Sequence, residues 1–197
     1  LEPLLRSLNL TAITLVLHDW GGPIGLAYAL RHPETVRRLV LTNTWGWPLT
    51  HRPLIQAFSR LASTPIGRLG IEHMNAFPRL VMPITLGPGA DCPPSWLGHY
   101  IDALDTRARR RACWLFARSL IAETAWLRAL WTRRHRLRDH PALLCWGMAD
   151  PAFGTEPTLR RWTALFSHAR VHRFDHVGHY LPEELGPAFA EHAASFL

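Results

Sequence analysis

The stretch that decides the fold reads Leu15-Val16-Leu17-His18-Asp19-Trp20-Gly21-Gly22-Pro23-Ile24-Gly25. Apolar, partly β-branched residues over 13–17 predict a buried strand. Pro23 predicts the start of a helix over 24–31, because a proline in the first helical turn lacks only an N–H that has no partner there. A strand, a sharp turn and a helix therefore follow one another within a few residues, and Asp19 stands at the tip of the turn.

The turn between this strand and this helix is typical of a nucleophile elbow, which aims its tip side chain at a substrate. The two glycines after Trp20 are expected to accommodate the strained backbone and to let the helix pack closely on the strand. A carboxylate at the tip can displace a leaving group from carbon and form a covalent ester. The positive end of the helix favours the ionised form of Asp19. The alternative interpretation is that Asp19 only caps the helix.

The run from His18 to Pro23 resembles the elbow of the haloalkane dehalogenases, an Asp-nucleophile branch of the α/β-hydrolase superfamily. The resemblance implies the C-terminal part of an α/β-hydrolase fold, with a mostly parallel sheet flanked by helices and an inserted all-helical cap. It also implies that the Trp20 indole N–H donates to a departing halide and that the Trp20 backbone N–H stabilises an oxyanion. The alternative for Trp20 is a packing role, since the chain has nine tryptophans.

The composition indicates one domain with a sizeable core, because the chain has 197 residues and 48% of them are apolar. The formal net charge is +7, and all 22 basic residues are arginines, many of them at 107–111 and 133–138. No aromatic platform or glycine-rich RNA motif accompanies these clusters, so we expect no nucleic-acid partner. The apolar run at 13–17 is too short to span a bilayer and no signal peptide precedes it, so we expect no membrane partner.

The cysteines indicate a reducing compartment. Cys92, Cys113 and Cys145 are odd in number and have no paired spacing. We therefore expect reduced thiols and a cytoplasmic location.

The rest of the chain predicts three further strands, over 39–44, 142–147 and 169–174. Strand, helix and strand in this order form a βαβ unit and hence a parallel sheet. A helix is expected from near Thr155, with a buried face made of Leu159, Trp162, Leu165 and Phe166. The last helix, over 183–197, is expected to bury Leu185, Phe189, Ala193 and Phe196.

The stretch 45–134 predicts no strand and several helices, over 54–61, 96–104 and 106–131, separated by breaks rich in proline and glycine. An all-helical insertion between two strands is interpreted as a lid over the site, in agreement with the cap of the resembled family. We therefore divide the chain into a nucleophile half of the α/β-hydrolase core at 1–44, a helical cap at 45–134, and an acid and histidine half at 135–197.

A covalent ester needs a base that activates water and a group that orients this base. His179 follows the last predicted strand and Gly178, and nucleophile, acid, histidine is the chain order of this fold. The run Gly-His-Tyr-Leu-Pro-Glu-Glu from Gly178 also resembles the corresponding dehalogenase segment. The competing interpretations are a surface or packing histidine, or a role for His176 beside it. Two histidines at this spacing without a third ligand make a weak metal site.

The acid is expected after the strand over 142–147, where Asp150 lies. An aspartate before Pro151 is also an ordinary turn former. The segment resembles the Gly-Met-x-Asp segment of the family, which implies that Asp150 is the acid. Some dehalogenases carry a glutamate after the sixth strand instead. This chain has Asn43 and Thr44 there, so Asp150 is the better candidate.

The resemblance implies hydrolytic dehalogenation in two steps. Asp19 displaces halide from an alkyl carbon, and His179, oriented by Asp150, then activates the water that hydrolyses the ester. The implied partners are a small apolar halogenated substrate, water and halide, with no metal or organic cofactor. Substrate size, preferred halogen and oligomeric state stay open.

Two other interpretations stay open: an Asp-nucleophile epoxide hydrolase or other α/β-hydrolase, and an inactive truncated remnant. Epoxide hydrolases use two cap tyrosines, and Tyr100 is the only tyrosine of the predicted cap, which counts against an epoxide. The second halide ligand stays open between three tryptophans, Trp45, Trp96 and Trp114. Full-length members of the family have four more strands and an oxyanion loop before the elbow, so we expect this chain to be an N-terminally truncated fragment.

Overall fold

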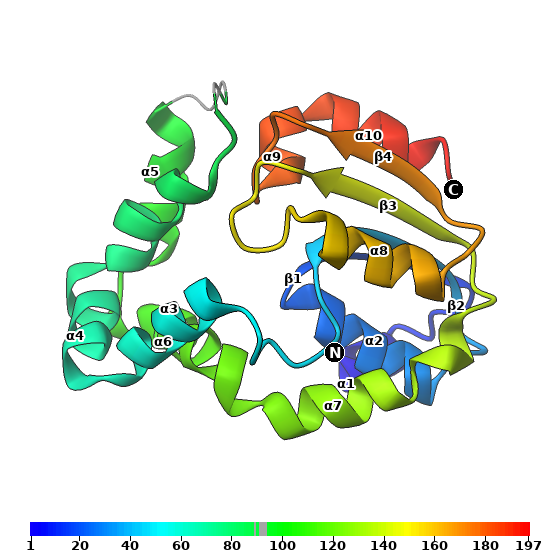
Figure 1. The fold of residues 1–197 in the computed structure, drawn as a ribbon, viewed down its shortest axis with the longest axis horizontal. Helices are drawn as coiled ribbons and strands as arrows, with labels where there is room; N and C mark the ends of the chain where they lie inside the picture. The colour runs from blue at the N-terminus through cyan, green and yellow to red at the C-terminus, as the bar shows by residue number, and fades with distance from the viewer. Residues whose placement is uncertain (89, 91–93) are drawn as a thin grey trace.

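The sheet at the centre of the molecule has four strands, β1 (Ile13–Asp19), β2 (Val36–Thr44), β3 (Ala142–Gly147) and β4 (Arg170–Phe174). The computed structural model describes residues 1–88, 90 and 94–197. Neighbouring strands are parallel, in the order β1-β2-β3-β4. The predicted α/β fold with a parallel sheet is confirmed, although β2 begins at Val36 rather than at 39. The carboxyl ends of the four strands lie at one edge of the sheet, where the arrowheads of β3 and β4 point in Figure 1.

Helices cover both faces of this sheet (Figure 1). On one face α2 (Gly21–Arg31), α7 (Thr124–Thr132) and α8 (Glu156–Leu165) pack on the strands through a large cluster of buried apolar side chains. The predicted inner face of α8 is confirmed, since its four expected residues are buried: Leu159, Trp162, Leu165 and Phe166. On the other face α9 (Leu181–Leu185) and α10 (Pro187–Ala194) pack on a smaller cluster around Val40 and Leu143. Every residue of β3 is therefore buried, as expected for a parallel strand that is covered on both faces.

The prediction of a single helix over 183–197 was wrong. Gly186 separates α9 from α10 with φ +52°, a left-handed value that glycine adopts without steric cost. The four side chains that we expected to be buried are only partly buried: Leu185, Phe189, Ala193 and Phe196. They lie on the second face of the sheet, where the apolar layer is thin.

The region between β2 and β3 has no strand among its described residues, as predicted. It contains α3 (Pro53–Ser63), α4 (Pro65–Met74), a π-helical turn η1 (Phe77–Val81), a 3-10 turn η2 (Pro83–Thr85), α5 (Pro94–Ala103), α6 (Arg107–Ala122), α7 and a 3-10 turn η3 (Arg134–Leu137). Figure 1 shows α3 to α6 beside the arrowhead end of β3 and β4, so this helical region stands next to the edge where the carboxyl ends meet.

Two details of the helical region differ from the sequence prediction. α4 was missed, because Pro65 was interpreted as a break, whereas it occupies the first turn of α4 after the capping Thr64 hydroxyl, which accepts from the Gly67 N–H. The helix predicted over 106–131 is interrupted at Glu123, where α6 ends and α7 begins. The interruption lets α7 leave α3 and α4 and pack on α2.

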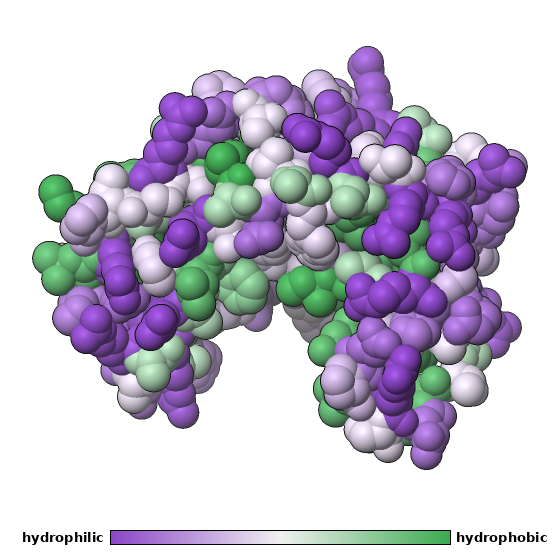
Figure 2. Space-filling view, turned by 90° about the horizontal axis from the view of Figure 1, so that it is seen from below, coloured by the Kyte–Doolittle hydropathy of each residue, from purple (hydrophilic) through white to green (hydrophobic). Residues whose placement is uncertain are grey.

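The surface is largely polar on the face shown in Figure 2, which is hollowed between two lobes. No helix among the described residues is both long and apolar enough to span a membrane.

Cys113 and Cys145 are free thiols, and burial raises the pKa of each, that of Cys145 to about 11. Cys92 lies outside the described residues.

The N-terminal helix α1 (Glu2–Ser7) lies against the end of α2. The Glu2 carboxylate accepts from Arg31 Nε and from His32 Nε2, at 3.1 and 2.9 Å. These contacts fix the start of the chain beside the loop that leads to β2.

Candidate active site

The predicted elbow is formed by the end of β1 and the start of α2. Asp19 has φ +46°, a left-handed value that costs a non-glycine residue about 1–2 kcal/mol. The Thr44 hydroxyl donates to the Asp19 carbonyl oxygen at 2.6 Å and holds this backbone in place. We expected the glycines to take the strained conformation, and this was wrong, because Asp19 takes it and Gly21 begins α2. A strained backbone at the tip of a turn is a frequent feature of functional sites.

The glycines of α2 allow the close approach that the sequence predicted. A Cβ at Gly22 would collide with the Thr44 side chain, and a Cβ at Gly25 would collide with Leu17. The helix begins at Gly21, ahead of the predicted start at Pro23, so its unpaired N–H groups lie directly after Asp19. The positive end of the helix therefore lies at the predicted nucleophile.

His179 lies between the two predicted aspartates. Its Nδ1 is 2.8 Å from Asp150 Oδ2, and its Nε2 is 3.8 Å from Asp19 Oδ1. Asp19 is the last residue of β1, and Asp150 and His179 lie in the loops after β3 and β4, at the carboxyl edge where parallel α/β sheets place their ligand sites. The structure thus brings together the three residues that the sequence singled out. His176, the competing histidine, is exposed.

Asp150 is held on both carboxylate oxygens. Oδ1 accepts from the Ala152 N–H at 2.7 Å, and Oδ2 accepts from His179 Nδ1 and from Asn43 Nδ2, each at 2.8 Å. Only 2% of the residue is exposed. An ionised carboxylate only accepts, so Nδ1 of His179 carries a proton and Nε2 is the atom that faces Asp19.

The charges in this cluster change the pKa values of both partners. Burial would raise the pKa of Asp150, but the charge of His179 and its hydrogen bonds to His179, Asn43 and Ala152 outweigh burial and lower it. Burial would lower the pKa of His179, but the charges of Asp150, Asp19 and Glu184 and the bond to Asp150 raise it to about 9. The cluster therefore favours an ionised Asp150 and a protonated His179 when Asp19 carries its charge.

Sequence reasoning missed the role of Asn43 in this cluster. Besides its bond to Asp150, the Asn43 amide donates to the Gly147 carbonyl oxygen at 2.9 Å and accepts from the Gly147 N–H at 2.8 Å. Its φ is +33°, and the residue is fully buried. Asn43 therefore fixes Asp150 and the end of β3 together. The sequence signal was a polar residue at the end of a buried strand, which we used only to rule out a glutamate.

His18, the residue before the predicted nucleophile, was also missed. Its Nε2 donates to the His179 carbonyl oxygen at 2.8 Å, and the two ring centroids are 4.7 Å apart. Burial, and next the charge of His179, lower the pKa of His18. A neutral His18 therefore ties the backbone of His179 to β1.

Aromatic rings line the site beside Asp19. The Trp20 ring lies edge-on to Trp45 at 5.0 Å and 5.7 Å from Phe116 of α6, and Trp45 stacks on Phe153 at 4.6 Å. Phe153 is in turn 5.9 Å from the His179 ring. The wall joins the sheet to the helical region and makes the surroundings of the carboxylate apolar.

The three tryptophans that the sequence left open differ in the structure. Trp114 is occupied, because its Nε1 donates to the Ala62 carbonyl oxygen at 2.9 Å within the helical region. The indole N–H groups of Trp45 and Trp96 are buried and have no hydrogen-bond partner within the described part of the chain. Of these two, Trp45 is the one in ring contact with Trp20.

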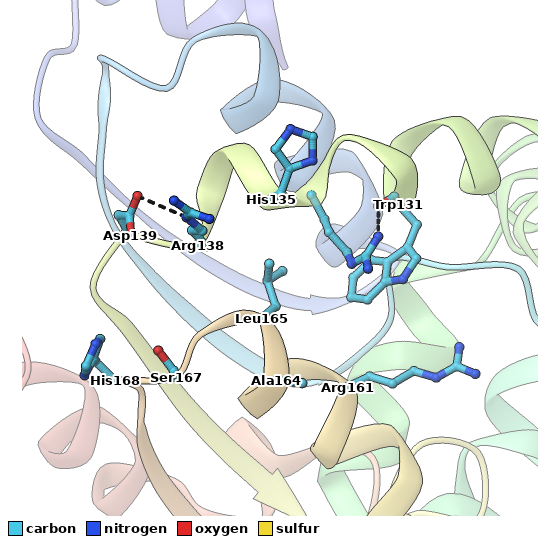
Figure 3. Close-up of a pocket in the computed structure, with 10 residues that line it drawn as sticks. Trp131, His135, Arg138, Asp139, Arg161, Ala164, Leu165, Ser167 and His168 are labelled. Atoms are coloured by element: carbon cyan, nitrogen blue, oxygen red, sulfur yellow. Dashed lines mark hydrogen bonds and ion pairs between the residues drawn. The ribbon is translucent and has the colours of Figure 1, made fainter.

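A separate pocket of about 580 Å³ lies between α7, η3 and α8 (Figure 3). Ten residues line it: Trp131, Arg134, His135, Arg138, Asp139, Arg161, Ala164, Leu165, Ser167 and His168. Arg134 packs on the Trp131 ring at 4.8 Å, and Arg138 pairs with Asp139 at 3.5 Å. The pocket shares no residue with the cluster around His179.

Within the described residues, no three His, Cys, Asp or Glu side chains gather as metal ligands would.

Comparisons with known proteins agree with this geometry. The α/β hydrolase fold family matches residues 1–184. A cis-3-alkyl-4-alkyloxetan-2-one decarboxylase of Shewanella oneidensis is 30% identical over 100% of this chain and 64% of its own. Haloalkane dehalogenase 2 of Mycobacterium tuberculosis is 32% identical over 84% of this chain and 57% of its own. The chain thus spans about three fifths of the length of these curated relatives.

The fold has a close match among solved structures. A haloalkane dehalogenase from Bradyrhizobium elkani superposes with a TM-score of 0.80 and 24% identity, over 99% of this chain and 71% of that one. At this identity the match supports the fold alone. The chain belongs to the α/β hydrolase fold family, and its sequence is similar to that of a haloalkane dehalogenase.

Proposed function

We propose that this chain carries the catalytic centre of a haloalkane dehalogenase, which converts a haloalkane and water into an alcohol and halide. The observation that carries the proposal is the line formed by Asp19, His179 and Asp150, with Asp19 on a strained tip beside a helix N-terminus. In the first step the Asp19 carboxylate attacks the carbon that bears the halogen, and the halide leaves. The product of this step is an alkyl ester of Asp19.

The halide is expected to leave toward the tryptophan side of the site. Trp20 would donate its indole N–H, as the resemblance to dehalogenases implied. Trp45 is the preferred second donor, because its buried N–H lacks a partner within the described residues and its ring touches that of Trp20. Two N–H donors in an apolar setting stabilise a leaving anion by donating hydrogen bonds to it.

Ester formation itself prepares the second step. Asp19 is one of the charges that raise the pKa of His179, and an esterified Asp19 has lost this charge. The pKa of His179 then falls, so Nε2 can release its proton and accept one from water. That water attacks the ester carbonyl, while the Trp20 backbone N–H holds the oxyanion and Asp150 holds the imidazolium. His179 is thus protonated in the resting protein, and it is neutral and able to act as a base once the Asp19 ester has formed.

The helical region takes the role of a cap in this proposal, with 45–134 as the cap and 1–44 and 135–197 as the two halves of the catalytic core. Phe116 on α6 contributes to the wall beside Trp20, so the cap side of the site is apolar. A small apolar halogenated substrate fits this environment, with water and halide as the other partners. The alternative epoxide hydrolase gains no support, because the Tyr100 hydroxyl donates to Glu183 at 2.7 Å.

A second candidate function is decarboxylation of an oxetan-2-one. It is favoured by the Shewanella oneidensis relative, which matches the whole chain at 30% identity. Attack of Asp19 on the ring carbon that bears the oxygen would break the carbon–oxygen bond and open this four-membered lactone to a carboxylate. Loss of CO₂ from that carboxylate would then form the alkene and expel the Asp19 carboxylate. The two functions differ in their released product, halide against CO₂.

One experiment separates these functions. The intact protein is incubated with 1-bromohexane in one arm and with a cis-3,4-dialkyl oxetan-2-one in the other, and bromide, CO₂ and alkene are measured. Bromide release that depends on Asp19 supports the dehalogenase. Alkene and CO₂ without bromide would overturn the dehalogenase and support the decarboxylase. The absence of all three products would overturn both candidate functions. Turnover of bromohexane in water labelled with heavy oxygen should also place the label in the Asp19 peptide, because water attacks the ester carbonyl.

A further inference from the structure

A second carboxylate, Glu184 of α9, is bound to the turn that carries His179. One of its oxygens, Oε2, accepts from the Gly178 N–H at 2.8 Å and from the Gly87 N–H at 2.9 Å. The other oxygen, Oε1, is buried and has no hydrogen-bond partner within the described residues. Glu184 therefore joins the residue before His179 to a segment of the helical region.

The two segments that Glu184 joins lie backbone to backbone. The His179 N–H donates to the Thr85 carbonyl oxygen at 2.8 Å. A Cβ at Gly178 would collide with this same carbonyl, and a Cβ at Gly87 would collide with the His176 carbonyl oxygen. No side chain fits into this crossing, so the hydrogen bonds at its rim determine where the His179 turn stands.

Glu184 also contributes charge to the site. Several groups face His179: Asp150 and Asp19 with carboxylates, His18 with a ring that is close to neutral, and Tyr180 at a ring distance of 5.1 Å. Burial raises the pKa of Tyr180, so its hydroxyl is uncharged. The negative charges that act on His179 are thus those of Asp150, Asp19 and Glu184.

We propose that Glu184 is a positioning residue for His179 with two roles: it clamps the His179 turn to residues 85–87, and it supplies a fixed negative charge to the imidazole. A glutamine would keep an oxygen acceptor for Gly178 and Gly87, so the property that glutamate adds is its charge. This charge remains when Asp19 is esterified, which stabilises the imidazolium formed during ester hydrolysis. The catalytic use of the charge rests on the proposed function, whereas its effect on His179 does not.

The electrostatic role is tested in the protein without any substrate. Glu184→Gln should lower the pKa of the His179 imidazole, followed by NMR titration of the ring, by roughly half a unit to one unit. Glu183→Gln is the matched control, because it removes the neighbouring charge, which lies at the surface and accepts from Tyr100. An unchanged pKa in Glu184→Gln, or an equal shift in Glu183→Gln, would overturn the electrostatic role.

The clamp is tested with Glu184→Ala, which removes the acceptor as well as the charge. We expect a lower Tm than in Glu184→Gln and faster hydrogen exchange at the Gly178 and Gly87 amides. Equal Tm and equal exchange in the two variants would overturn the clamp. If the proposed function holds, Glu184→Gln also moves the acidic limb of ester hydrolysis to lower pH, because the neutral imidazole persists further into acid. If the unmodified protein releases no bromide, the proposed function is overturned, whereas the titration result for Glu184 still stands.

Discussion

The two carboxylates on either side of His179 are built differently. The Asp150 side chain is 0% exposed, contacts Nδ1 at 2.8 Å and is held on both oxygens. The Asp19 side chain is 38% exposed, and its nearer oxygen is 3.8 Å from Nε2, too far for a hydrogen bond. Burial with full hydrogen bonding fits a carboxylate for holding a histidine, while exposure at a strained tip leaves a carboxylate free to react.

The largest effect is expected from removing the exposed carboxylate of this pair, that of Asp19. Asp19→Asn should reduce bromide release by roughly 10⁴-fold or more, because a neutral amide does not displace halide from carbon. The measurement is initial-rate bromide release, with Asp139→Asn as a control that removes an exposed carboxylate elsewhere. Turnover of Asp19→Asn within tenfold of the unmodified protein would show that Asp19 is not the nucleophile, and the Asp19 carboxylate does not cap α2 either, since the N-cap residue is Trp20.

Removing the histidine between the two carboxylates should separate the two chemical steps. His179→Ala leaves Asp19 able to attack but leaves no base for the ester, so an alkylated protein should accumulate. Intact mass spectrometry after exposure to 1,2-dibromoethane, followed by peptide mapping to Asp19, measures this. Steady bromide release without an adduct would contradict the role of His179 as the base.

Removing the Asp150 carboxylate should have a smaller effect, again on ester hydrolysis. Asp150→Asn should slow ester hydrolysis by roughly 10³–10⁴-fold, because an amide no longer stabilises the imidazolium and can favour the wrong tautomer. The adduct should still form at a near-normal rate, which distinguishes Asp150 from Asp19. A variant that loses ester formation and ester hydrolysis equally would remove the contrast between the two carboxylates.

The support behind Asp150 offers a finer test. Asn43→Ala removes a hydrogen bond to a charged group, which typically contributes about 1.5–3 kcal/mol, and should slow ester hydrolysis by about tenfold. Asn75→Ala is a matched control, because Asn75 is also buried with positive φ but lies in the helical region, where it donates to the Ile101 carbonyl oxygen. Both variants should lower Tm, and only Asn43→Ala should slow the second step. An equal loss of rate in both would show that Asn43 acts through stability alone.

Local patterns were enough to place the reacting groups. The four strands, the elbow and the loops that carry Asp150 and His179 all follow from short runs in which apolar residues end at a polar or glycine residue. Asp150 and His179 were chosen from their positions after predicted strands, from the chain order of the fold and from the resemblance to the dehalogenases. Parallel strands bring their carboxyl ends to one edge, and the three side chains meet there. Their chemical roles are the proposal made above.

The contacts that support these groups could not be predicted from local patterns. Asn43 and Gly147 are 104 residues apart in the chain, and their pairing depends on the register of β2 against β3. The bonds from Glu184 to Gly178 and Gly87 depend on how the helical region lies against the sheet. The break at Gly186 was missed because the apolar residues on both sides keep a helical period, although a glycine with positive φ is a common way to end a helix.

The smallest expected effect concerns the pH dependence of stability, which should reflect both carboxylates through His179. The pKa of His179 is raised to about 9 in the folded protein, so its contribution is complete below the unfolded value of about 6.5 and is lost as the pH rises through 9. The pKa of Asp150 is lowered, so its contribution is complete above the unfolded value of about 3.9 and is lost as the pH falls through the folded value. The Tm should therefore decline between about pH 6.5 and 9 more steeply in the unmodified protein than in His179→Phe, which lacks the titrating group. The Tm of Asp19→Asn should decline less steeply than that of the unmodified protein, because one of the charges that raise the pKa of His179 is gone. The Tm of Asp150→Asn should decline even less steeply than that of Asp19→Asn. Parallel Tm curves for all four proteins would show that neither carboxylate stabilises a charged His179 in the fold.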